Sequence, residues 1–432
     1  MKHTMTPYDF ARNTWLRMER LRSCRERLKR FTYGRQWDDT VIDPDGNIFT
    51  EAELARRAGR RPLTNNLLRS LVKSVVGRFR HNVQSETLSA ELAEIHSLNS
   101  LSELDARLLE EFLISGCAIQ RVAVENRPDG HHLWVDNVAP TRFFCNRFLD
   151  PRGSDIRLVG MLHDMSAQEL RMRFSHGSHR RALELDRMFA GASGLRPECS
   201  IASVNPDPDA VAWGRPSDPS LFRVVEVWTF EHVRHHGPCW YSRFYAPDGT
   251  VIDETRSPWA HRSHPFVVKF YPLTDGEVHP FIEDVIDQQM HINRLITTID
   301  HILSNSAKGV LLFPTDALPA GVSISEATRL WNRPAAVIPV NPKARSMPKE
   351  ITTSGRSEGA SALLDIEFQL FQQISGVSGA LQGQTPAGNV SASLYESQTN
   401  NAVVAMMDIY STFNSFRSAR DAKALGCTRN SD

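Results

Sequence analysis

The sequence predicts a mainly helical α+β protein with a strand-rich N-terminal part, on three observations. Residues 281–308 carry apolar side chains three and four positions apart and contain neither proline nor glycine, which is typical of a long helix. Alternating β-branched and aromatic residues recur between residues 117 and 272, which is typical of strands. Two further stretches with helical spacing, near 360–374 and 391–424, follow the long segment.

Composition and charge describe an ordinary globular chain. Of its 432 residues, 41% are hydrophobic and 23% are charged, which leaves room for two or three domains. The formal net charge is zero, but residues 1–35 hold ten Lys and Arg against three acids, and residues 54–85 hold eight and no acid. This uneven distribution favours a positive surface on one part of a larger assembly.

The cysteines and the N-terminus bear on the compartment. The six cysteines are scattered without a CxxC pair, which favours free thiols in a reducing environment. The N-terminal stretch MKHTMTPYDFARNTW lacks the apolar core of a secretory signal. No apolar run approaches the roughly 20 residues that cross a bilayer. We therefore expect a soluble cytosolic chain that makes no contact with a membrane.

The N-terminal part is expected to alternate helices with strands. A basic amphipathic helix is predicted over 8–30, either as a solvated face or as a phosphate-contacting surface. Further helices are predicted from near Thr64, over 103–116 and over 166–173. CAIQRVAVEN and HHLWVDNVAP are predicted to form a hairpin, and FRVVEVWTFEHV, CWYSRFYAPDG and PFVVKFYPL one antiparallel element.

The helix predicted over 281–308 is bounded by start and stop signals, Pro280 before it and Gly309 after it. At about 1.5 Å per residue it spans roughly 40 Å, so its apolar stripe requires a long partner. The plain alternative is a core helix of an ordinary domain. The stripe includes Phe281, Val285, Ile292, Leu295, Ile299 and Ile302.

A small insertion separates this helix from the next one. GVLLFP and AAVIPV are predicted strands around a short helix near 325–331, and Lys343, Arg345 and Lys349 stand among prolines. A helix over about 360–374 then leads back. The two long helices are therefore expected to form an antiparallel pair.

A polar loop, GQTPAGN, precedes the third helix, which is predicted over 391–424. Uncharged polar side chains gather around this loop, among them Gln384, Thr385 and Asn389. Neutral amides hold phosphates more weakly than Lys or Arg, so DNA would slide along such a loop. A plain surface loop is the alternative.

No stretch of the sequence demands catalysis. The histidine clusters show no HExxH pattern and no cysteine or carboxylate at ligand spacing. These clusters are His131–His132, His235–His236 and His176 with His179. The patterns GxxxxGK[ST] and GxGxxG are absent. We therefore expect no enzymatic activity, no catalytic or metal-binding residue and no cofactor.

Five motifs, each degenerate by itself, follow one another along nearly the whole chain. They are YGRQW at 33–37, RPLTNNLLRSLVKSVVGRFR at 61–80, VAPTRFFCNRFLDP, IEDVIDQQMHINRLIT and ISGVSGALQGQ. In this order they resemble the portal proteins of tailed bacteriophages. The resemblance implies a portal-like fold with two antiparallel stem helices, a small α/β clip and a long tunnel helix.

The resemblance also implies a division of the chain. It places a wing region at 1–280, a first stem helix at 281–308, a clip at 309–358, a second stem helix at 359–378, and a tunnel loop and tunnel helix at 379–432. Portals usually continue into a crown, which is expected to be short or missing here.

The function implied by the resemblance is a ring-shaped channel at one capsid vertex, through which double-stranded DNA is packaged and ejected. The ring is expected to be a homo-oligomer, a dodecamer, in the virion and, during assembly, in the host cytoplasm. It would dock the terminase large subunit and later the neck and tail proteins, beside the capsid. The implied sites are the channel lining at Gln384, Thr385 and Asn389, motor docking at Lys343, Arg345 and Lys349, and inter-subunit stem packing at Val285, Ile292, Leu295 and Ile299.

The sequence leaves two alternatives open. A metal-dependent nucleic-acid-processing enzyme would hold its substrate with the basic N-terminal part and bind metal through the histidines. Another virion adaptor or scaffold subunit would act in the particle without portal ring symmetry.

Overall fold

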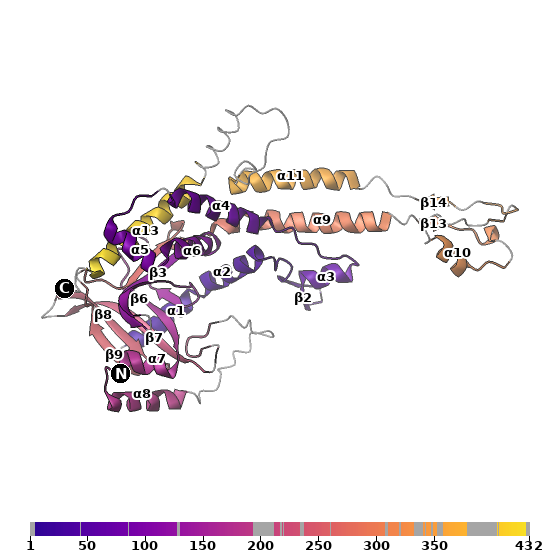
Figure 1. Cartoon of the computed structure of the whole chain (residues 1–432). Coiled ribbons are helices and arrows are strands. Elements are labelled where there is room, and N and C mark those ends of the chain that lie inside the picture. The colour runs from indigo at the N-terminus through magenta and orange to yellow at the C-terminus, as the bar shows by residue number, and fades with distance from the viewer. Residues whose placement is uncertain are drawn as a thin grey trace. The chain divides into compact units, whose positions relative to one another are not determined.

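A computed structural model of the chain describes residues 5–43, 45–84, 86–127, 130–192, 211–216, 218, 220–233, 237–259, 261–306, 310–318, 321–331, 340–341, 343–346, 349–351, 357–377, 404 and 406–428. The chain forms two compact units, each of which is described by itself (Figure 1). The first unit comprises residues 1–34, 66–286 and 373–432, and the second comprises residues 35–65 and 287–372.

The first unit begins with two helices, α1 (Pro7–Arg17) and α2 (Glu19–Thr32), where the sequence predicts one. The chain leaves the helical conformation at Met18, whose φ of −86° and ψ of 8° end α1. A capping box between Thr6 and Asp9 starts α1, because each side chain accepts a bond from the other residue's backbone N–H.

Three more helices follow in this unit: α4 (Leu67–Val83), α5 (Ala90–Leu98) and α6 (Leu101–Ser115). The predictions of α4 and α6 are confirmed, and α5 was not predicted. Gly116 ends α6 with a φ of +69°, and a Cβ there would lie 2.4 Å from a side-chain methyl of Val278. Only glycine fits this turn, because it needs both the left-handed backbone and the empty space.

A three-stranded antiparallel sheet has the order β10–β3–β4. The predicted hairpin is confirmed as β3 (Cys117–Arg127) paired with β4 (Gly130–Asn137). The prediction that PFVVKFYPL joins the two strands before it is wrong, since β10 (Phe266–Phe270) pairs with β3. The first seven residues of β3 are all buried, so this strand is covered on both faces and has a neighbour on each edge.

A second, five-stranded antiparallel sheet runs in the order β5–β6–β7–β8–β9. Its strands are β5 (Phe143–Cys145), β6 (Leu158–Met165), β7 (Phe222–Val233), β8 (Gly237–Tyr245) and β9 (Val251–Arg256). Ser166 and Glu169 form the expected capping box of α7 (Ala167–Phe174), which α8 (His179–Ala192) follows. Apolar side chains of this sheet pack with α1 around Trp15 and Trp213.

The first unit is completed by short elements and by the C-terminal helix. The short elements are β11 (Leu273–Thr274), β12 (Glu277–Val278) and the 3-10 turn η1 (Phe281–Val285). The C-terminal helix α13 (Met407–Thr428) packs against β3 and β10.

The second unit is built along α9 (Ile286–Ser306), which lies in the predicted long helix. The predicted helix starts as η1 and becomes α-helical only at Ile286. Beside α9 lie a small hairpin and helix, β1 (Thr40–Ile42), β2 (Ile48–Thr50) and α3 (Glu51–Arg57). The sequence analysis did not predict this module, which is called the hairpin–α3 module below.

Beyond α9 the second unit continues into β13 (Val310–Leu312), η2 (Thr315–Ala317), α10 (Ile324–Trp331) and β14 (Lys349–Ile351). α11 (Ser357–Ser375) then leads back. β13 and β14 pair antiparallel, so α9 and α11 run in opposite directions, and Figure 1 shows these helices side by side. The predicted strand AAVIPV lies almost entirely outside the described residues.

Candidate assembly surfaces

A ladder of polar side chains covers one face of α9. Gln289, Asn293 and Thr297 lie four positions apart, hence on one side of the helix, and all three are buried. Gln289 donates a hydrogen bond to the backbone carbonyl of Asn65 over 2.6 Å, and Asn293 donates to the side chain of Gln36 over 2.5 Å. These bonds attach the hairpin–α3 module to α9.

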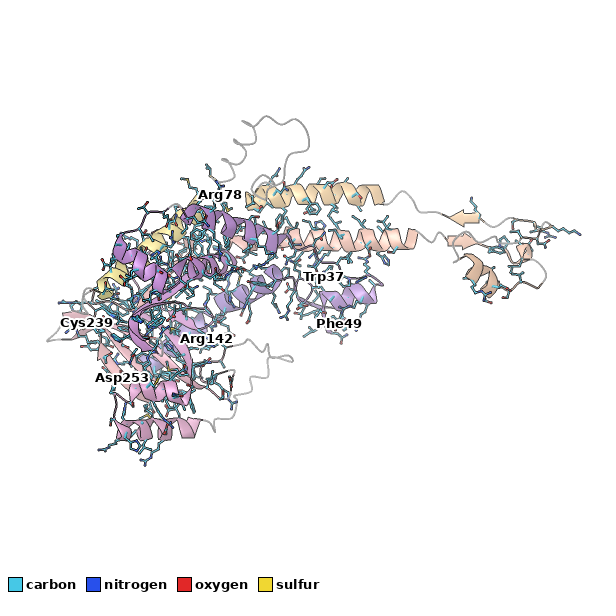
Figure 2. The ribbon with its side chains drawn as sticks, viewed as in Figure 1. Trp37, Phe49, Arg78, Arg142, Cys239 and Asp253 are labelled. Atoms are coloured by element: carbon cyan, nitrogen blue, oxygen red, sulfur yellow. The ribbon has the colours of Figure 1, made fainter. Side chains whose placement is uncertain are left out.

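Backbone groups of the module bond to the same ladder. The N–H of Asn65 donates to Asn293 Oδ1, and the N–H of Leu63 donates to Thr297 Oγ1, each over 3.0 Å. The indole N–H of Trp37 donates to the carbonyl of Leu63 over 3.1 Å. In Figure 2, Trp37 lies nearer to α9 than Phe49 does. Because the ladder satisfies backbone groups that do not belong to a helix or strand, it fixes an otherwise irregular segment.

Two further side chains of α9 make contacts outside the ladder. Arg294 of α9 donates to Glu51 of α3 over 2.6 Å. His291, on the far side of α9 from the ladder, contacts Glu367 of α11 through its Nδ1 over 2.9 Å. At about 100° per residue, His291 lies about 160° around the helix axis from both Gln289 and Asn293. The hairpin–α3 module and α11 therefore contact opposite sides of α9, as Figure 1 also shows.

The residues predicted to pack between subunits do not share one environment. Val285 and Ile292 are 0% exposed within the single chain. Both side chains are covered by the chain itself, and the packing of these two residues between subunits stays a prediction. Leu295 and Ile299 are half-buried and keep part of their surface. Apolar periodicity placed all four on one stripe, but it could not show that the polar ladder occupies the neighbouring face.

The predicted motor-docking cations lie in the small segment between α9 and α11. Lys343, Arg345 and Lys349 are all exposed. Lys349 begins β14, while the other two belong to a loop held against η2. The N–H of Arg345 donates to Asp316 Oδ2 over 3.0 Å, and the N–H of Asn341 donates to the carbonyl of Ala317 over 2.9 Å. The loop backbone is therefore fixed while its cationic side chains face solvent.

The predicted channel-lining residues Gln384, Thr385 and Asn389 lie outside the described residues. The helix that follows them is described from Met407 onward as α13, and it is tied to the first unit by buried charges. Asp105 of α6 is 2% exposed and accepts hydrogen bonds from Arg417 over 3.0 Å and from Arg420 over 2.5 Å. The side chain of Arg420 is itself 0% exposed.

Further carboxylates complete this network. Arg417 forms a two-pronged ion pair with Glu86, with both distances 2.8 Å. Arg420 also donates to Asp421 over 2.9 Å, and His96 contacts the same carboxylate over 3.0 Å. Hydrogen bonds from Arg417 hold the pKa of Glu86 below its usual value. The network was not predicted, although RSARDAK does place two arginines and an aspartate on consecutive helical turns.

A buried lysine lies one turn further along α13. Lys423 Nζ donates to the carbonyls of His264 and Phe266, each over 2.7 Å. Burial lowers its pKa to about 7, and burial together with the Lys423 charge lowers the pKa of His261 to about 4. A lysine whose folded pKa lies below its unfolded pKa binds fewer protons when folded between those two values.

We therefore expect the free energy of unfolding to rise with pH above about 7, with Lys423 contributing to the rise. Urea unfolding at pH 7.0 and pH 8.5 measures this rise in the parent chain. Lys423→Met removes the titrating group and should flatten it. A rise of the same size in Lys423→Met would show that other groups produce it.

A cavity of about 460 Å³ lies in the first unit, between α1–α2 and the segment from β10 to η1. Its apolar floor includes Phe148 and Phe270, and its rim carries arginines and glutamates. Cys24 lines it, and burial followed by the charge of Glu283 raises the pKa of this thiol. The thiol is thus held in its protonated, weakly nucleophilic form at neutral pH.

Among the described residues, no three His, Cys, Asp or Glu side chains lie close enough together to hold a metal ion. No helix in the described ranges has the length and hydropathy needed to span a membrane.

The family model described as Phage P22-like portal protein matches residues 9–421. No curated protein matches the chain.

Proposed function

Because the chain belongs to the family of phage P22-like portal proteins, we propose that it assembles into a dodecameric ring whose centre conducts double-stranded DNA. The chain is a phage portal protein, a structural component of the virion and of its head-to-tail connector. The observation that carries this function is a family match that extends over nearly the whole chain. The family implies a homo-oligomeric ring, with the capsid and DNA as its partners. The number of subunits in the ring is our proposal.

The division of labour along the chain is also proposed. Residues 1–280 would form the wing, α9 and α11 the two stem helices, and 309–358 the clip. The order of elements supports this layout, since α9 leads out to a small strand-paired segment and α11 leads back. Residues 379–432 would form the tunnel loop and tunnel helix, with Gln384, Thr385 and Asn389 lining the channel.

The ring itself is tested by negative-stain imaging and by mass measurement of the purified protein. Rings with a central pore and a mass of twelve chains are the expected result. Particles that stay monomeric at every salt and protein concentration would overturn the proposed function.

Ile299→Asp should weaken ring formation without unfolding the first unit, since Ile299 is half-buried on the proposed stem helix. We expect the proportion of chains in rings to fall at least about tenfold, because a carboxylate loses hydration on entering an apolar contact. Asp300→Asn, on the same helix at an exposed position, is the matched control. If Ile299→Asp forms normal rings, Ile299 does not lie in the interface between subunits.

The clip is proposed to dock the terminase large subunit through Lys343, Arg345 and Lys349. Reversing all three charges to glutamate should leave the rings intact and weaken co-sedimentation with that subunit about tenfold or more. The loop backbone would persist, because Arg345 bonds to Asp316 through its N–H and not through its side chain. Arg329→Glu, an exposed change on α10, is the control, and equal weakening by both variants would count against a specific site.

The proposed ring acts at two stages of the phage cycle, DNA packaging and DNA ejection. The ring would form in the host cytoplasm during assembly and later hold neck and tail proteins in the virion. The energy for packaging would come from the docked motor, so the chain itself is proposed to be non-enzymatic.

A further inference from the structure

α11 exposes a row of large apolar side chains. Leu363, Ile366, Leu370 and Ile374 are three or four positions apart and are 39%, 51%, 38% and 43% exposed. Residues at this spacing lie on one face of a helix. The strip of α11 beside this row is already covered, since Glu367 and Phe371 are buried. A continuous exposed apolar row of this kind marks an interaction surface.

The charges of α11 have one sign. Over Ser357–Ser375 the helix contains Glu358, Asp365 and Glu367 and no lysine or arginine. Glu367 is paired with His291, whereas Asp365 is exposed and forms no ion pair among the described residues. At 100° per residue Asp365 lies about 100° around the helix axis from Ile366, so the exposed half of α11 carries the apolar row along one side and this carboxylate along the other.

The hairpin–α3 module exposes a second apolar surface. Ile42 and Ile48 are each 68% exposed, and they are cross-strand partners of the two-stranded sheet. Val41 is 37% exposed on the other face of the same hairpin. Cross-strand neighbours lie about 4.5–5.5 Å apart, so Ile42 and Ile48 form one patch.

The charges of the module have the opposite sign to those of α11. Arg56, Arg57, Arg60 and Arg61 fall within six residues at the end of α3, and all four are exposed. The guanidinium of Arg57 lies 3.7 Å from the ring centre of Phe49, which fixes this end of α3 to the hairpin. Within the described part of the chain, Arg56, Arg60 and Arg61 form no ion pair.

These two surfaces lie on opposite sides of α9. The module is bonded to the ladder face of α9 and α11 to the His291 face, all within the second unit. A closed ring of identical chains uses head-to-tail contacts, in which one side of a copy meets the other side of the next. Such a contact requires two different surfaces that complement each other in apolar area and in charge.

We propose that the hairpin–α3 module of one copy docks on the free face of α11 of the next copy around the ring. Ile42 and Ile48 pack against Leu363, Ile366 and Leu370, and the arginines at the end of α3 lie beside Asp365. The partner is thus a second copy of this chain. The inference rests on the proposed ring and names the surfaces that close it.

A pair of introduced cysteines tests the contact. Ile48→Cys combined with Ile366→Cys, under mild oxidation of assembled protein, should give a ladder of covalent multimers on a denaturing gel. Each single variant should give no more multimer than the parent chain. In the proposed contact, residue 48 of one copy faces residue 366 of the next copy, and neither residue faces its own counterpart. A ladder from the double variant alone supports the proposal.

The other outcomes are also decisive. Dimers from either single variant would indicate that like surfaces meet, and the proposal would be wrong. Imaged rings of the double variant without a ladder would place the contact elsewhere and leave the portal ring intact. Absence of rings in the parent chain would instead overturn the proposed function, and the inference with it.

A charge swap tests the polar part without cysteines. Arg60→Glu with Arg61→Glu should raise the protein concentration needed for half-assembly about tenfold, and adding Asp365→Arg should restore at least part of the loss. Glu53→Gln, an exposed change on α3, is the control. If the arginine variant assembles normally but retains less DNA, the arginines contact nucleic acid and the charge pairing is wrong.

Discussion

Asp105→Ala should lower the free energy of unfolding by about 3–5 kcal/mol, because it leaves Arg417 and Arg420 buried without the carboxylate between them. Removing one partner of a buried ion pair costs more than the pair contributes, since the remaining charge stays desolvated. Arg417 keeps two hydrogen bonds to Glu86 and Arg420 keeps one to Asp421, so the larger share of the loss falls on Arg420. The expected consequence is detachment of α13 from α6.

Urea unfolding measures the free energy, and limited proteolysis shows which helix is released. Cleavage in residues 407–428 should appear before cleavage elsewhere in the first unit. Asp105→Asn keeps one acceptor oxygen and should lose less. Glu94→Ala, an exposed change on α5, serves as the control. A stability within about 1 kcal/mol of the parent for Asp105→Ala would show that α13 is held mainly by its apolar contacts around Phe413.

Asn293→Leu should cost about 3 kcal/mol and should free the hairpin–α3 module from α9. Asn293 accepts from the part-buried Asn65 N–H and donates to the buried Gln36 side chain, so leucine removes both hydrogen bonds. Losing each such bond inside the protein costs roughly 1–3 kcal/mol. The remaining bonds of Gln289 and Thr297 keep part of the attachment.

Limited digestion with trypsin measures how often the module opens, because trypsin cuts after the arginines at the end of α3. Trypsin should cut after Arg56, Arg57, Arg60 or Arg61 faster in Asn293→Leu than in the parent chain, because the module opens more often. Ring formation should fall in parallel if this module closes the ring. Asp300→Asn is the control on α9. Unchanged cleavage and stability would mean that the polar ladder contributes little to holding the module.

Local sequence patterns were sufficient for much of the secondary structure. The hairpin β3–β4 follows from alternation around RPDG, and α7 follows from a capping box, since both depend on neighbours in sequence. The family resemblance rested on the order of degenerate motifs, and the family match supports it. The small segment between the two long helices was also expected from the sequence, because local start and stop residues set its bounds.

Other features depended on contacts between distant residues. The segment PFVVKFYPL has the same alternation of residues as the two strands before it. Its pairing was decided by tertiary structure, because β10 bonds to the edge of β3 that β4 leaves open. Val285 and Ile292 fit the predicted stripe, yet both are fully covered within the chain. The hairpin–α3 module was missed because its strands have three residues each, too short for a periodic signal.

By itself, therefore, the sequence determined that this chain is a helical α+β portal protein with a long helix pair and a strand-rich N-terminal part. Repeating local patterns and their order along the chain carry that information. Only the tertiary structure decided which face of α9 is used, and which surfaces are left for another copy. Burial of Gln289, Asn293 and Thr297 arises from backbone groups more than two hundred residues away, and no local pattern encodes that contact.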